Sequence, residues 1–143
     1  MYLVPYHFED EKNIKFSKEY REQFKQFKQA SDVLLAYGDT LIVLRHLEGA
    51  IEELLNKYKI HYNKKTYPDN LELLIKKLVV KNAHLKSLDK QIQYVLLMRR
   101  KFLYECFHQP HQSIMFYSED MRLQFNYIYH LFLTLENAIR RLV

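Results

Sequence analysis

The chain has 143 residues, of which 48% are hydrophobic and 15% aromatic. This length suits one domain with a sizeable core, and this composition excludes an intrinsically disordered protein. The formal net charge of +5 permits contact with RNA but is too modest to demand it. Only two glycines and three prolines occur, which favours long helices over a turn-rich sheet protein.

Several features bear on location. The single cysteine, Cys106, excludes an internal disulfide and fits a reducing compartment. The first eight residues hold no basic segment and are followed by acids from Glu9 onward, so no secretory signal is predicted. The longest charge-free runs, 106–118 and 123–135, are shorter than the roughly 20 residues that span a bilayer. We therefore expect a cytoplasmic protein without membrane contact.

Two helices are predicted in the first part of the chain from apolar residues at helical spacing. The first begins at Ser17, and a long second helix runs from Ser31 to Lys59, with Gly38 as the place where it can kink. The inward stripe of the second helix alternates steps of three and four residues and contains one acid: Leu34, Tyr37, Leu41, Leu44, Glu48, Ile51, Leu55 and Tyr58.

Three further helices are predicted after a polar connection, residues 60–68. Asp69 is the expected N-cap of a short helix that turns four residues inward: Leu71, Leu74, Ile75 and Leu78. Ser87 is the expected cap of the next helix, which ends before Pro110. The final helix runs from 118 to 141, with acids in its first turn and cations in its last.

No segment alternates as a strand, so the predicted fold is all-α. We expect an antiparallel bundle of about five helices that forms a single domain, residues 1–143, with residues 1–16 as an N-terminal arm.

Three consecutive cations, Arg99, Arg100 and Lys101, interrupt an apolar helical run. On a helical wheel Arg99 falls near the middle of the apolar stripe and Arg100 at its flank. A guanidinium that faces a core must pair with an opposite charge or contact a ligand or a partner, because burying an unpaired charge costs several kcal/mol. Three interpretations remain open: an ion pair between Arg99 and Glu48, a site for RNA phosphate or a nucleotide formed by the three cations, or a surface for self-association.

Catalytic and metal-binding spacings are mostly absent. The sequence has no glycine-rich phosphate loop, no paired-cysteine zinc motif and no HExxH. Cys106, His108 and His111 are the nearest approach to a set of metal ligands, but Pro110 interrupts them and no fourth donor follows from the spacing. We therefore expect no metal and no cofactor, and we interpret Cys106 as a small buried hydrophobe.

The order of elements from Leu47 to Leu142 resembles the HEPN superfamily of small all-helical bacterial domains. The resemblance lies in the helical segments 47–55 and 70–78, in the run Arg100-Lys101-Phe102-Leu103-Tyr104-Glu105, and in the long final helix after Tyr117. Many members carry an Arg-x(4–6)-His motif where this run stands. The resemblance implies a homodimer whose interface builds a metal-independent RNA-cleaving site, in a toxin–antitoxin or phage-defence system.

Carried onto this chain, the motif is degenerate. Arg100 matches the family arginine, but Glu105 occupies the histidine position, and seven residues separate Arg100 from His108. The resemblance then favours a non-catalytic interaction module or RNA- or nucleotide-binding module, with Arg99, Arg100 and Lys101 as binding residues and RNA or another protein as partner. The alternative is a divergent ribonuclease that uses Arg100 with His108 or Glu105 as proton-transfer group.

Overall fold

The computed structural model describes residues 18–105 and 119–143. Within these two ranges the chain is all-helical and has no strand, which confirms the predicted all-α bundle. The helices are α2 (Lys18–Lys57), α3 (Leu71–Lys81), α4 (Ala83–Ser87), α5 (Asp89–Tyr104) and α6 (Glu119–Arg140). The N-terminal arm predicted for residues 1–16 lies outside the described residues. Three other residues singled out in the sequence also lie outside them: Cys106, His108 and His111.

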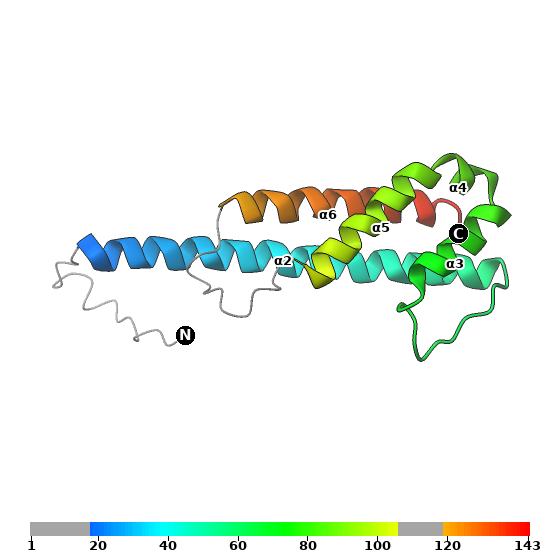
Figure 1. Cartoon of the computed structure of the whole chain (residues 1–143), viewed down its shortest axis with the longest axis horizontal. Helices are drawn as coiled ribbons and strands as arrows, with labels where there is room; N and C mark the ends of the chain where they lie inside the picture. The colour runs from blue at the N-terminus through cyan, green and yellow to red at the C-terminus, as the bar shows by residue number, and fades with distance from the viewer. Residues whose placement is uncertain (1–17, 106–118) are drawn as a thin grey trace.

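The three long helices alternate in direction along the chain (Figure 1). α5 runs back along α2 and α6, so consecutive long helices are antiparallel as predicted. The first and last of them, α2 and α6, are parallel. Thr40 meets Phe125 and Lys57 meets Leu142, and the separation in sequence is 85 residues in both contacts. A constant separation in sequence means that the two helices run in the same direction.

The core lies where α2, α5 and α6 meet, and its centre is aromatic. Phe102 of α5 is fully buried, with its ring centre 4.8 Å from that of Tyr37, 5.8 Å from Phe125 and 5.9 Å from Phe132. The contacts with the two phenylalanines are edge-to-face, the arrangement that the charge distribution of aromatic rings favours. Beside this cluster the buried hydroxyl of Thr40 lies 3.0 Å from the carbonyl oxygen of Phe125 and ties α2 to α6.

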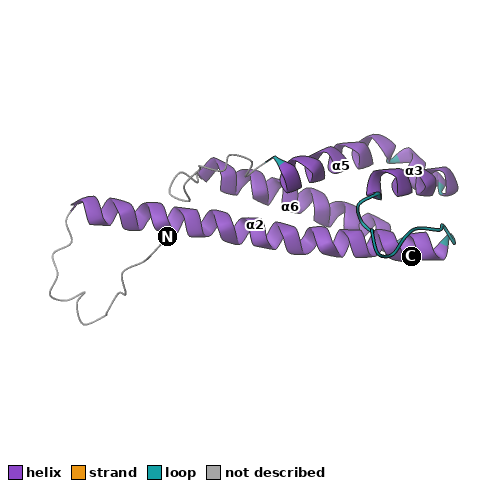
Figure 2. Cartoon of the chain, turned by 60° about the horizontal axis from the view of Figure 1, so that its bottom comes forward, coloured by secondary structure: helices purple, strands orange, loops and turns teal. Residues whose placement is uncertain are grey.

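α2 is one helix of 40 residues where two were predicted. It continues without interruption through Ser31 and Gly38, and in Figure 2 it extends beyond α6 at its N-terminal end. The buried stripe is rotated slightly from the predicted one, since Leu34 is 41% exposed while Val33 is fully buried. The helix ends at Lys57. Lys59, two residues later, has a left-handed φ of 55°, which lets the Ile60 amide donate to the Leu55 carbonyl oxygen.

The helix boundaries in the middle of the chain differ from those predicted. Asn70, not Asp69, is the N-cap of α3, although the four inward residues of α3 are buried as expected. A short extra helix, α4, begins after Asn82, whose side chain accepts a hydrogen bond from the Leu85 amide. Ser87 ends α4 and its hydroxyl donates to the His84 carbonyl oxygen, so the predicted cap of the next helix serves another role.

Candidate functional site

Arg99 and Glu48 form a buried ion pair, which is the first of the three interpretations that the sequence left open for Arg99. The Nη2 of Arg99 donates to the Oε2 of Glu48 over 3.0 Å, and both residues are less than 10% exposed. Arg45, one turn before Glu48 on α2, donates to the other carboxylate oxygen over 2.6 Å. The Nε of Arg99 is buried without a hydrogen-bond partner among the described residues. Arg99 is therefore part of the core, and its ion pair with Glu48 joins α5 to α2.

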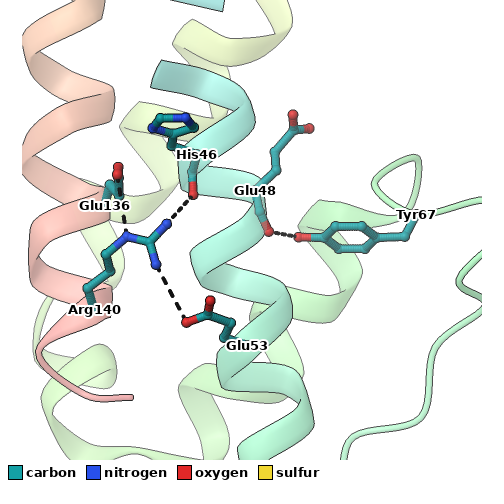
Figure 3. A network of polar contacts seen from close by, with 6 residues as sticks. All are labelled: His46, Glu48, Glu53, Tyr67, Glu136 and Arg140. Carbon is teal, nitrogen blue, oxygen red and sulfur yellow. Dashed lines mark hydrogen bonds and ion pairs between the residues drawn. The ribbon is translucent and has the colours of Figure 1, made fainter. Parts of the chain in front are cut away.

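Tyr67 attaches the connection after α2 to the same point of that helix. Its hydroxyl donates to the backbone carbonyl oxygen of Glu48 (Figure 3). Burial, together with the nearby carboxylates of Glu48 and Glu52, raises the pKa of the Tyr67 phenol well above its usual range. The phenol therefore stays protonated and keeps its role as a donor at physiological pH.

Arg100 and Lys101 lie on the surface, unlike Arg99. The Nη2 of Arg100 donates to the Oε1 of Glu72 over 2.5 Å, and this hydrogen bond is the main cause that raises the pKa of Arg100. Both side chains of this pair are about half exposed, so the contact links α5 to α3 through a solvated ion pair. Adjacent helical positions are about 100° apart, which explains why the three predicted binding residues diverge.

The structure describes two of the predicted catalytic candidates, Arg100 and Glu105. Glu105 is exposed and follows the last residue of α5. Its charge is close enough to Arg100 to contribute to the raised pKa of that arginine, after the larger effect of Glu72. His108 lies outside the described residues. Among the residues that are described, no group of three potential metal ligands is present.

A second polar network joins the end of α6 to α2, and the sequence analysis missed it. The guanidinium of Arg140 lies 3.4 Å from a Glu136 oxygen and 3.5 Å from a Glu53 oxygen, and it donates to the His46 carbonyl oxygen over 3.2 Å (Figure 3). Glu136 is buried, and the four-residue step from Glu136 to Arg140 is the signal that could have revealed the pair.

Two pockets were not predicted from the sequence. An apolar groove of about 490 Å³ lies between α5 and α6, with Leu88, Val95, Leu131 and Leu135 among its lining. A smaller pocket of about 130 Å³ lies between the 61–67 connection and α3, and its lining is mostly polar. The lining of the small pocket belongs to the 61–67 connection and to α3 with its N-cap Asn70. Figure 1 shows α3 and α4 at the same end of the molecule.

This end is strongly basic. Nine lysines lie between Lys57 and Lys90, against three carboxylates, Asp69, Glu72 and Asp89. The segment therefore has a larger positive charge than the whole chain, whose net charge is +5. Among the described residues, all nine of these lysines are exposed and none forms an ion pair. Five of them lie in the 61–67 connection and on α3: Lys64, Lys65, Lys76, Lys77 and Lys81. The excess of lysines in this segment can be counted in the sequence, but the modest net charge of the whole chain does not reveal it.

Comparison of the chain with known protein families, with characterised proteins and with solved structures finds no significant match. In the described ranges, no helix is both long enough and apolar enough to cross a membrane. The fold and these surfaces define the class of protein: an all-α bundle with a buried ion-pair network and one basic end.

Proposed function

We propose that this protein is a non-catalytic RNA-binding module. The observation that carries the proposal is the basic end formed by the 58–70 connection, α3 and α4, where exposed lysines without ion pairs gather. RNA is a polyanion, and lysines that are not neutralised by carboxylates can replace the counterions along its backbone. Release of these counterions supplies most of the free energy of sequence-independent binding.

The surroundings of the cationic cluster support the non-catalytic part of the proposal. Phosphoryl transfer needs an unengaged cation near the phosphate and a proton-transfer group close to it. Here Arg99 is buried against Glu48, and Arg100 is paired with Glu72. We therefore assign these arginines mainly to structure.

The test is RNA binding as a function of salt, combined with a cleavage assay. Purified protein is titrated against single-stranded and structured RNA by fluorescence anisotropy, in EDTA and over a series of salt concentrations. We expect binding that weakens steeply with salt, and intact RNA at the end of the titration. Absence of salt-sensitive binding contradicts the proposal.

Cleavage of the RNA in EDTA, lost in both Arg100→Ala and His108→Ala, establishes the divergent ribonuclease instead. Loss in only one of the two variants identifies which of these residues the reaction needs. In either case the non-catalytic assignment falls.

We also infer a homodimer, the assembly that the HEPN resemblance implies, in a toxin–antitoxin or phage-defence setting. Its support is an exposed apolar surface on α5 and α6. Tyr94 and Leu97 are one helical turn apart on α5, and Leu123 and Tyr127 are one turn apart on α6; all four are more than 40% exposed. The hydroxyls of Tyr94 and Tyr127 lie 3.0 Å apart, so the two helices share this face. Burial of such a surface against a second copy would remove it from water.

A further inference from the structure

We propose that the small polar pocket between the 61–67 connection and α3 binds one phosphate group of a single-stranded RNA. The inference deepens the proposed function and rests on it. The pocket has a volume of about 130 Å³, and its polar lining comprises His61, Asn63, Thr66, Asn70 and Lys77, with Tyr62 and Tyr67 beside them. This assigns a particular place and a ligand group to the basic end.

The chemistry of the lining suits an anion. Lys77 is exposed and has no ion pair with any described residue, and no carboxylate lines the pocket. The side chain of Asn70 forms no capping hydrogen bond with its own helix, which leaves its amide free for a ligand. The Asn63 side chain uses its oxygen to accept from the Lys65 amide, so its NH₂ group keeps its donors. A group that offers several acceptor oxygens and a negative charge complements this set.

The lining of the pocket selects the part of the RNA that enters. The volume of about 130 Å³ admits a phosphate group, and the mostly polar lining with Lys77 favours that anion over a base. The remainder of the nucleotide then lies against the surrounding surface.

The pocket is held in shape by contacts to the core. Tyr67 is fixed by its hydrogen bond to the Glu48 carbonyl oxygen, and the ring of Tyr62 packs against it with 5.4 Å between the ring centres. Two further hydrogen bonds close the turn: Thr66 donates to the Asn63 carbonyl oxygen through its hydroxyl and again through its backbone amide. A site formed before the ligand arrives loses less free energy to ordering.

A single strand fits this geometry better than a duplex. The pocket is recessed between a loop and a helix, so a phosphate must leave the line of its neighbours to enter it. A flexible strand can bend in this way, and its unstacked bases can pack against an aromatic ring such as the partly exposed Tyr62 at the rim. Duplex phosphates follow a fixed helical path.

Lys77→Ala is the test, and Lys76→Ala is its matched control. Both variants remove one exposed lysine from adjacent positions of α3, but only Lys77 lines the pocket. For a short single-stranded RNA of mixed sequence, we expect Lys77→Ala to weaken binding about tenfold, as loss of a charged hydrogen bond does. The slope of log affinity against log salt should also fall by about 0.7, the value for one phosphate contact with a single strand. Lys76→Ala should change affinity only about twofold.

Asn70→Ala adds an uncharged variant, and it should weaken binding without changing the salt slope, because it removes a donor and no charge. Equal losses in Lys77→Ala and Lys76→Ala overturn the pocket while leaving RNA binding by the basic end intact. Equal affinity of the wild type for a duplex of the same length overturns the choice of a single strand. Lack of salt-sensitive RNA binding by the wild type removes the proposed function itself, so the failures can be told apart.

Discussion

Glu48 and Arg99 are each misplaced when their helices are considered separately, because each is a charged residue within an apolar stripe. The structure joins them across 51 positions of sequence in a contact of 3.0 Å. Periodicity could predict this pair, since two buried charges of opposite sign on facing helices each need a partner. The role of Tyr67 was not predictable, because a loop tyrosine carries no periodic signal. The three-residue step from Arg45 to Glu48 could have indicated their contact.

Arg99→Ala should lower the free energy of unfolding by about 3–5 kcal/mol, because it leaves the Glu48 carboxylate buried with one partner fewer. Glu48→Ala should have a comparable effect, and the double variant should cost less than the sum of the two. Urea denaturation followed by circular dichroism measures all three. Arg100→Ala is the control and should remain close to the wild type, since its ion pair is solvated. Equal stability of the Arg99→Ala and Arg100→Ala proteins would contradict the structural role of the buried pair.

Tyr67 should make stability depend on pH in the alkaline range. Its pKa is raised in the folded protein, so the native state holds the phenolic proton more tightly than the unfolded chain. The stabilisation is fully present below the unfolded pKa of about 10 and is lost as the pH rises above it. Urea titrations from neutral to alkaline pH should show a smaller decline for Tyr67→Phe than for the wild type. At neutral pH Tyr67→Phe should cost about 1 kcal/mol, the usual net value of one hydrogen bond. Parallel declines in the two proteins would be inconsistent with this assignment.

At the scale of elements, the sequence predicted the positions of helices well and their ends poorly. The inward residues of α3 and the extent of α6 follow directly from apolar spacing and from the charges at the helix ends. Ser31 and Ser87 were wrongly predicted to begin helices, because serine is favoured at N-caps but is also tolerated inside a helix or at its end. The α2 segment around Ser31 contains neither glycine nor proline, and nothing local stops the helix there.

Gly38→Ala and Gly49→Ala should each stabilise the protein, and this follows from the length of α2. Both glycines are helical, neither has a positive φ, and a Cβ added at either position meets no atom within 4 Å. Alanine therefore gains the helix propensity difference of about 0.8–1 kcal/mol without a steric cost. Thermal and urea denaturation should show an increase for each single variant and an additive increase for both, since the two sites are three helical turns apart. A decrease at either site would contradict the open space found around that glycine.

At the scale of the whole molecule, the parallel direction of α2 and α6 could not be predicted from the sequence pattern. It depends on how the segment between them folds back, and helical periodicity carries no information about direction. The basic end could have been predicted, because the 58–70 connection, α3 and α4 are consecutive in the chain and lie together (Figure 1). A charge averaged over the chain hides it, because acids elsewhere offset the lysines.

The apolar face of α5 and α6 makes a prediction about assembly. If two copies pair through it, Leu97→Glu should convert the dimer to a monomer, because a carboxylate at the centre of the interface would be desolvated without a partner. Ile42→Glu is the control: Ile42 is 59% exposed on α2 and Leu97 is 41% exposed on α5, so both introduce a carboxylate at an exposed apolar position. Light scattering after size exclusion should give a dimer mass for the wild type and Ile42→Glu and a monomer mass for Leu97→Glu, with helicity unchanged in all three. A monomeric wild type would contradict the dimer, and dissociation by Ile42→Glu alone would move the interface to the outer face of α2.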